Sequence, residues 1–275
     1  MTRAQRGQRL DQALVDRGVA RSRALAREYI AAERVRCNGT VLAKASSRVT
    51  DEDDLELIGE PERYVGRAAY KLIGALEEFP QVRVEGRRCL DVGASTGGFT
   101  QVLLERGAAE VVALDVGHGQ LAEPVRSDPR VVERSGTSIR DVTVDDLGGG
   151  FGVVVADLSF ISLTLVMNVL SSLLHPDGDL VVLVKPQFEV GRERLGSDGV
   201  VRSAQQRAEA VGGVLEVAEQ AGLSVHGVTI STVTGTHGNL EYLLWLRAAP
   251  EGRMDPAQVA TALATIRTND DEGQR

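Results

Sequence analysis

The sequence predicts an α/β protein built on a seven-strand parallel sheet, with a small α+β unit at its N-terminal end. Beyond residue 60, aliphatic strands alternate with helical segments, which is the pattern of strands joined by crossover helices. The run at residues 179–185, DLVVLVK, is apolar on both faces, as expected at the centre of a sheet. The first 60 residues instead combine two helical patterns with short strands around Asn38-Gly39, the strongest two-residue hairpin signal.

Each predicted element follows from its local pattern. In the N-terminal unit, residues 9–18 and 22–35 have helical periodicity, and Ser22 is a suitable cap for the second helix. Short strands are expected at residues 35–37, 40–42 and 53–59. The α/β part has helical patterns at 66–79, 99–107, 163–174 and 204–221, and strand patterns at 87–93, 110–116, 131–135, 151–160, 179–185, 223–232 and 240–247.

These patterns divide the chain into three parts. Gly59-Glu60-Pro61 is the expected boundary between the N-terminal unit, residues 1–60, and the α/β domain, residues 61–250. Residues 251–275 are expected to form a polar, partly disordered tail.

The composition indicates a soluble protein of the reducing cytoplasm. Of the 275 residues 43% are hydrophobic, which is enough to bury a real core. Cys37 and Cys89 lie far apart in the sequence, so neither a disulfide framework nor a zinc site is predicted, and we expect no metal. Neither a signal peptide nor an apolar stretch long enough to span a membrane is evident, so no membrane partner is expected.

The charge distribution favours nucleic-acid binding although the formal net charge is −8. Residues 1–48 contain eleven Lys and Arg against four Asp and Glu, whereas the rest of the chain is acidic. A basic module on an acidic body is typical of proteins that grip RNA phosphates.

The N-terminal unit resembles the S4 RNA-binding domain. The resemblance rests on Leu10-Asp11, Leu14, Gly18, Ser22-Arg23, Ala26, Ile30, Val35, Asn38-Gly39, Val49 and Asp53-Asp54. Glu33 departs from the family, which usually has glycine before the valine. Guanidinium groups bind phosphates through paired hydrogen bonds. The predicted RNA-binding residues are therefore Arg17, Arg21, Arg23, Arg27, Arg34 and Arg36. The alternative interpretation of these arginines is a solvated, charged surface.

A second motif, CLDVGASTGGFT at residues 89–100, places a glycine-rich turn between a strand and a helix. Such a turn lets backbone amides approach a ligand, and Asp115 ends the next strand, where a carboxylate can accept hydrogen bonds from ribose hydroxyls. The spacing is not that of dinucleotide enzymes and resembles motif I of S-adenosylmethionine methyltransferases. The predicted cofactor is S-adenosylmethionine, bound by Asp91, Gly93, Ser95, Thr96, Gly97, Gly98, Phe99, Asp115 and His118.

Further segments extend the resemblance over nearly the whole chain: YVGRAAYKL, LDVGASTGGFT, DVGHGQL, DLSFISL, KPQFEVGRE and GNLEYLLWL. Together they resemble the TlyA family, also called hemolysin A, whose members are rRNA cytidine 2′-O-methyltransferases. The resemblance implies a Rossmann-like class I methyltransferase domain related to FtsJ, acting on a cytidine ribose of 16S or 23S rRNA. His118 stands where the family more often has an aromatic residue, and Ser138 replaces an expected asparagine.

FtsJ-like enzymes share a Lys-Asp-Lys-Glu tetrad, and the matching positions are Lys71, Asp157, Lys185 and Glu241. The same residues suit the chemistry, because a ribose hydroxyl needs a base or a polarising group beside it. Lys185 is predicted to be that base or an electrostatic positioner, with Asp157 and Glu241 orienting the ammonium groups. The alternative is a structural cluster of ion pairs.

Three other functions compete with rRNA methylation. A small-molecule methyltransferase would need the glycine loop and Asp115, but it would leave the basic N-terminal unit without a role. A ribosome-assembly RNA-binding protein with a vestigial methyltransferase domain would not need the intact tetrad. A pore-forming hemolysin lacks support from any membrane-spanning pattern in the sequence. We therefore expect ribosomal RNA or ribosomal subunits as the partner and a monomeric protein.

Overall fold

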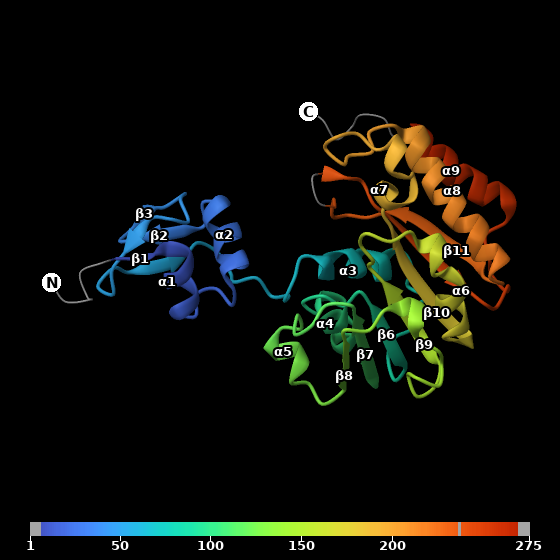
Figure 1. The fold of residues 1–275 in the computed structure, drawn as a ribbon, viewed down its shortest axis with the longest axis horizontal. Helices are drawn as coiled ribbons and strands as arrows, with labels where there is room; N and C mark the ends of the chain where they lie inside the picture. Colours follow the sequence, from blue (N-terminus) through green and yellow to red (C-terminus); the bar gives the residue numbers. More distant parts are fainter. Residues whose placement is uncertain (1–6, 236–237, 269–275) are drawn as a thin grey trace. The chain divides into compact units, whose positions relative to one another are not determined.

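The computed structural model describes residues 7–235 and 238–268. The chain divides into two compact units between Arg63 and Tyr64, each with its own hydrophobic core (Figure 1). This boundary lies three residues beyond the expected one, so from here on the N-terminal unit is residues 1–63 and the C-terminal unit is residues 64–275.

The N-terminal unit is a small α+β fold. The predicted hairpin is confirmed, because Cys37 pairs with Thr40 around Asn38 and Gly39, whose φ angles are 50° and 80°. Ser22 caps the second helix by accepting a hydrogen bond from the backbone amide of Leu25. The elements are β1 (Gln8–Arg9), α1 (Leu10–Asp16), α2 (Arg23–Ala31), β2 (Val35–Cys37), β3 (Thr40–Val41), β4 (Arg48–Val49) and β5 (Leu55–Leu57).

Glu33 occupies a turn in which glycine would be the residue with the least backbone strain. Glu33 follows α2 and has a φ of 56°, in the left-handed region that glycine adopts without strain. The amide of Arg34, the next residue, donates to the carbonyl oxygen of Tyr29 and so closes the helix end. The turn therefore forms in spite of the glutamate, with some backbone strain.

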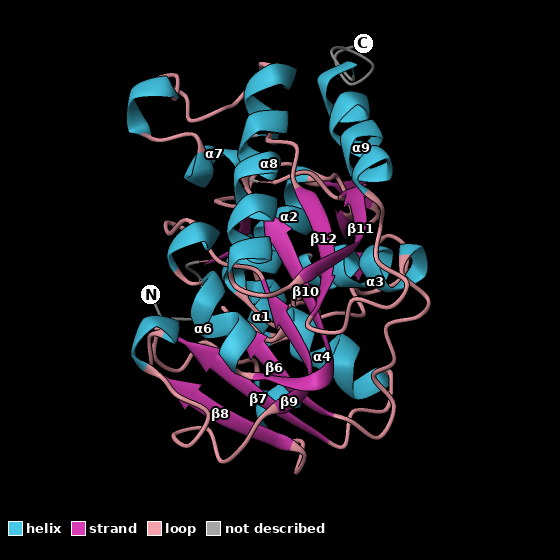
Figure 2. Ribbon diagram, turned by 90° about the vertical axis from the view of Figure 1, so that its right-hand side faces the viewer, coloured by secondary structure: helices cyan, strands magenta, loops and turns pink. Residues whose placement is uncertain are grey.

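The C-terminal unit is built on one seven-strand sheet in the order β11-β12-β10-β9-β6-β7-β8 (Figure 2). The central strand is β9, and the apolar strand predicted for the centre, β10, lies beside it. The strands are β6 (Arg88–Val92), β7 (Glu110–Asp115), β8 (Val131–Ser135), β9 (Phe151–Ala156), β10 (Leu174–Val184), β11 (Ser224–Ile230) and β12 (Tyr242–Arg247).

The expectation of a wholly parallel sheet is wrong for one strand. β12 runs antiparallel to both β10 and β11. Only residues 231–241 join β11 to β12, its neighbour in the sheet, and a connection of this length is too short for the crossover that a parallel pair requires.

Helices cover both faces of the sheet because successive strand residues point to opposite sides. Leu90 and Val92 of β6 face the core covered by α6 and α8, whereas Cys89 faces the core covered by α3 and α4. The helices are α3 (Ala68–Glu78), α4 (Gly98–Glu105), α5 (Glu123–Arg126), α6 (Met167–Ser172), α7 (Pro186–Glu189), α8 (Ala204–Gln220) and α9 (Pro256–Thr268). The helix expected at residues 163–174 is shorter, because a 3₁₀ turn occupies residues 163–165.

The expectation of a polar tail from residue 251 is also wrong for most of that segment. Residues 256–268 form α9, which packs on α8 and β11 (Figure 1). Ile266 is buried there, and Val259 and Leu263 contact the same core. The few apolar side chains of α9 lie on one face, so a weakly amphipathic sequence still forms a docked helix. Residues 269–275 of the expected tail lie outside the described residues.

The contribution of α9 to stability can be measured. We expect Ile266→Ala to lower the free energy of unfolding by about 2 kcal/mol or more, because a buried isoleucine is truncated. Arg267→Ala, at the exposed next position, is the matched control and should change the stability little. Equal denaturant midpoints for the two variants would contradict the docking of α9.

Candidate active site

The candidate active site lies at the carboxyl edge of the sheet. β6 pairs in parallel with both β7 and β9, so the strand order reverses at this point, where open α/β sheets bind their ligands. Gly93 follows β6, Asp157 follows β9 and Lys185 follows β10. Because these parallel strands end at the same edge, the sheet brings the three residues together.

The glycine-rich turn at residues 93–97 lies close to the end of β9. Gly93 has a φ of 84°, and a side chain at this position would place its Cβ 2.8 Å from the carbonyl oxygen of Asp157. Gly97, the residue before α4, has a φ of 93°. Only glycine fits both the backbone conformation and the close approach at residue 93, so this turn forms one wall of a recess.

A cavity of about 160 Å³ joins the glycine-rich turn to two of the four predicted tetrad residues. Phe99 contributes to its lining and also packs in the core between α4 and the sheet. The lining residues are Ala68, Gly93, Ala94, Ser95, Thr96, Gly98, Phe99, Asp157, Ser159 and Lys185.

The four predicted tetrad residues form a chain of alternating charges. Lys71 of α3 lies between two carboxylates, with its Nζ 2.6 Å from Glu241 Oε2 and 3.9 Å from Asp157 Oδ2. The other oxygen of Asp157, Oδ1, lies 2.6 Å from the Nζ of Lys185. No side chain of the four is more than 12% exposed. Two positive and two negative groups balance one another, as buried charges require.

Ser159 is a member of this site that the sequence analysis did not single out. Lys185 Nζ donates a hydrogen bond to Ser159 Oγ at 2.8 Å. The serine lies two residues beyond Asp157 in the same segment, and this proximity is the only sequence signal that could have identified it. Lys185 is thus held from two sides.

Asp91 carries an unsatisfied oxygen in the interior beside the turn. Its Oδ2 accepts a hydrogen bond from Thr100 Oγ1 at 2.6 Å, but Oδ1 is buried and has no partner among the described residues. Burial raises the pKa of Asp91 to about 7. A free acceptor of this kind, beside a turn that only glycine fits, is suited to a ligand that brings a hydrogen-bond donor.

Asp115 organises the second half of the predicted cofactor site. Its Oδ2 accepts from the backbone amide of Ser95 at 2.8 Å, and its Oδ1 accepts from Gly117 at 2.7 Å and from Gln120 Nε2 at 3.3 Å. Gln120 is a further residue that the sequence analysis missed. His118 is exposed, lies against Gly136 and does not line the small recess beside Asp115.

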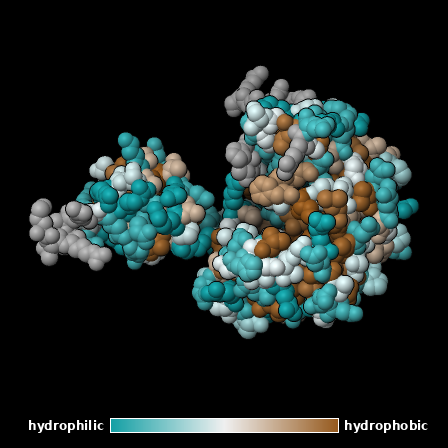
Figure 3. All heavy atoms as spheres, in the orientation of Figure 1, coloured by the Kyte–Doolittle hydropathy of each residue, from teal (hydrophilic) through white to brown (hydrophobic). Residues whose placement is uncertain are grey.

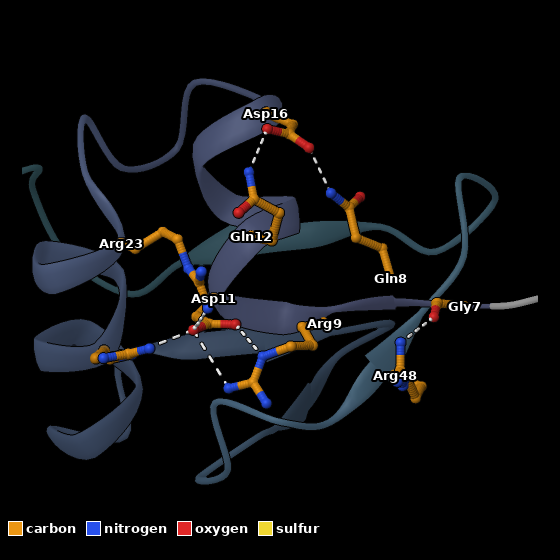
Figure 4. A network of polar contacts seen from close by, with 9 residues as sticks. Gly7, Gln8, Arg9, Asp11, Gln12, Asp16, Arg23 and Arg48 are labelled. Atoms are coloured by element: carbon orange, nitrogen blue, oxygen red, sulfur yellow. Dashed lines mark hydrogen bonds and ion pairs between the residues drawn. The ribbon is translucent and has the colours of Figure 1, made fainter.

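The six predicted RNA-binding arginines fall into three groups. Arg17, Arg21 and Arg34 donate to backbone carbonyl groups, such as those of Asp53 and Glu60. Arg23 and Arg27 instead bind the carboxylate of Asp11, together with Arg9, which the sequence analysis did not include (Figure 4). Arg36 is exposed on β2.

Comparisons with known proteins agree with this architecture. The model of the FtsJ-like methyltransferase family matches residues 64–248, and that of the S4 domain matches residues 8–55. A 16S/23S rRNA (cytidine-2'-O)-methyltransferase TlyA of Mycobacterium tuberculosis is 51% identical, covering 87% of this chain and 89% of the relative. Hemolysin A of Brachyspira hyodysenteriae is 36% identical, covering 86% of this chain and 98% of the relative.

Solved structures point the same way. A structure described as a hemolysin from Streptococcus thermophilus superimposes with a TM-score of 0.74 at 36% identity, and each chain is covered to 96%. Within the described residues, no helix is long and apolar enough to cross a membrane. The FtsJ-like family model matches more than half of the chain, and the TlyA relative is 51% identical over most of both chains. This chain therefore belongs to the FtsJ-like methyltransferase family and carries an S4 domain in front of the catalytic domain.

Proposed function

We propose that this protein transfers a methyl group from S-adenosylmethionine to the 2′-hydroxyl of a cytidine in ribosomal RNA. The observation that carries the proposal is the buried chain Glu241–Lys71–Asp157–Lys185, whose last two members line the same cavity as the glycine-rich turn. The TlyA relative, which carries the name of an rRNA (cytidine-2'-O)-methyltransferase, supports cytidine as the target. Such an enzyme acts in the cytoplasm, where ribosomal RNA is found.

The residues around the turn fit S-adenosylmethionine. When bound, this cofactor supplies a methyl group that its sulfonium has already activated, so the protein needs no metal to activate the methyl group. The unpartnered oxygen of Asp91 and the glycine-lined wall at Gly93 accommodate a cationic, hydrogen-bonding ligand. We assign the cofactor to Asp91, Gly93, Ser95, Thr96, Gly97, Gly98, Phe99 and Asp115, with His118 at its outer edge.

We assign proton removal to Lys185. A ribose hydroxyl becomes a useful nucleophile when a positioned group takes its proton. Lys185 is an ammonium in the charge-balanced site, so it must first release a proton to solvent through the cavity that it lines. The neutral amine then accepts the proton of the hydroxyl, and Asp157 Oδ1, 2.6 Å away, stabilises the ammonium that forms again. Ser159 holds the same nitrogen in place. Lys71, which Glu241 holds at 2.6 Å, lies 3.9 Å from the other oxygen of Asp157 and keeps the charges of the site balanced.

The RNA substrate is assigned to two surfaces. The N-terminal unit supplies exposed arginines for phosphates, and its visible face is mostly hydrophilic (Figure 3). Phe160 follows Ser159, which lines the catalytic cavity; the residue is 92% exposed, its φ is 66°, and the centre of its ring lies 5.2 Å from that of Phe188. An exposed aromatic ring held in a strained backbone is suited to stack on an unpaired base.

These features argue against the competing functions. A small-molecule methyltransferase would not require the arginine-rich unit. A vestigial enzyme would not require these four buried charges, which balance only when all four are present. The hemolysin reading rests on the names of relatives alone.

The role of Lys185 can be tested by single-turnover methyl transfer to unmodified ribosomal RNA. We expect Lys185→Ala to lose a factor of about 10² to 10⁴ in rate while it still binds the cofactor, because it loses a positioned acid-base group. Lys185→Arg should not rescue the rate, since a guanidinium does not deprotonate in proteins. Full activity of the arginine variant would exclude the base role, and full activity of the alanine variant would remove Lys185 from the reaction.

The burial of Asp91 predicts a pH-dependent stability. Its pKa is raised from an ordinary value near 4 to about 7, so the folded state favours the protonated form. The stability that this proton provides is complete below pH 4 and is lost as the pH rises through about 7. Asp91→Asn cannot ionise, so its free energy of unfolding should fall less than that of the wild type between pH 5.5 and 8.5, a difference of about 2 kcal/mol.

Urea unfolding of the cofactor-free protein at several pH values measures this effect. Asp145→Asn, which removes an exposed carboxylate, is the control and should keep the wild-type profile. Parallel pH profiles for Asp91→Asn and the wild type would show that Asp91 is already ionised at low pH and would contradict the prediction.

The division of labour between the two units can be tested by removing residues 1–63. Each unit has its own core, so the remaining chain should fold and bind S-adenosylmethionine as the full protein does. Its affinity for ribosomal RNA should be at least about tenfold lower than that of the full chain. The loss of affinity should be largest at low salt, because the lost contacts are to phosphates. If the shortened protein methylates ribosomal RNA at the same rate as the full chain does, the N-terminal unit is not required for binding the RNA substrate.

A further inference from the structure

Three arginines of the N-terminal unit surround one fully buried carboxylate. The side chain of Asp11, at the start of α1, is 0% exposed, and it is reached from β1 and from α2 (Figure 4). Arg9 places its Nε 2.9 Å from Oδ1, while Arg23 Nη2 and Arg27 Nε lie 2.8 and 3.1 Å from Oδ2. We call these four residues the Asp11 cluster.

The cluster has an excess of positive charge and of unused hydrogen-bond donors. Three guanidinium groups meet one carboxylate, which leaves an excess of two positive charges. The arginine side chains are 40%, 46% and 57% exposed, although the carboxylate beneath them is sealed from water. Each guanidinium has five N–H donors, and within the described residues the only acceptor for these three is Asp11. Most of their donors therefore face solvent.

Two other arginines of the unit, Arg17 and Arg34, are used differently. Arg17 donates to the carbonyl oxygens of Asp53 and Thr50, and Arg34 donates to those of Ile58 and Glu60. These guanidinium groups tie loops together. The Asp11 cluster instead gathers three side chains of like charge, which would repel one another and spread apart without the carboxylate.

Fixing these side chains in advance favours anion binding. A free arginine loses side-chain entropy when it is immobilised on a ligand. Arg23 and Arg27 are one turn apart on the same face of α2, and Asp11 holds both beside Arg9. The same hydrogen bonds, that of Arg9 first, keep the pKa of Asp11 far below its usual value, so the carboxylate stays charged at neutral pH.

We propose that Asp11 is a positioning residue for RNA binding: it presents Arg9, Arg23 and Arg27 as one preformed site for a backbone phosphate. The inference rests on the proposed RNA-binding role of the N-terminal unit. Its consequence is opposite to that of simple charge counting, because the loss of this negative charge weakens the binding of a polyanion.

The test measures the affinity of full-length variants for deproteinised ribosomal RNA by filter binding over a range of salt concentrations. Asp11→Asn adds one unit of positive charge and should nevertheless bind about tenfold more weakly. The dependence of log affinity on log salt should become shallower by about 0.7 to 0.9, the equivalent of one lost phosphate contact. A purely structural role would leave this salt dependence unchanged in the folded variant.

Asp16→Asn is the matched control on the same helix. Asp16 is exposed and accepts hydrogen bonds only from the amides of Gln8 and Gln12 among the described residues, so its removal makes the same change in charge without releasing an arginine. This variant should bind RNA as tightly as the wild type or more tightly.

Circular dichroism and thermal melting establish that each variant is folded at the assay temperature. If Asp11→Asn unfolds the N-terminal unit, Arg27→Lys replaces it, because this variant keeps the charge and loses the guanidinium that binds Asp11. It should also bind more weakly. Wild-type affinity in a folded Asp11→Asn, or in Arg27→Lys when it stands in, would overturn the positioning role alone. A wild-type protein without measurable affinity for RNA would overturn the RNA-binding function itself.

Discussion

The C-terminal unit depends on the neutralisation of charges that its sheet edge buries. Lys71 is nearly sealed from water, and Glu241 and Asp157 are the carboxylates that make its burial possible. These groups come from α3, from the end of β9 and from the segment before β12, so the ion pairs also fasten a helix to two strands of the sheet. Losing one member would leave an unpaired buried charge, which is why the stability and the chemistry of this site are coupled.

The same edge holds groups that are unfavourable in the absence of a ligand. Asp91 is buried with an unsatisfied oxygen, and Phe160 exposes a large apolar ring in a left-handed backbone conformation. Each feature costs folding free energy. Such costs are common where a protein prepares a site for a ligand. Asp91 lies two residues before Gly93 and Phe160 directly follows Ser159, and both Gly93 and Ser159 line the cavity that Lys185 also lines.

Arginines serve two purposes in the N-terminal unit. Some close its loops through backbone carbonyl groups, as Arg17 and Arg34 do, and those around Asp11 remain open to solvent. Counting positive charges in the sequence treats these arginines alike. The difference between them arises from which acceptor the fold places within reach, and it is the basis of the localised phosphate-binding surface that we propose for this acidic protein.

The sequence alone determined the order and type of most elements, since the patterns behind the Asn38-Gly39 hairpin, the cap at Ser22 and the strand–turn–helix at Gly93 are local. Motif resemblance also selected the four tetrad residues. Only the tertiary structure decided the antiparallel direction of β12, the docking of α9, and the partnerships of Ser159 with Lys185 and of Asp11 with three arginines. These features depend on residues distant in sequence whose packing and charge balance exist only after the chain has folded, so no local pattern could encode them.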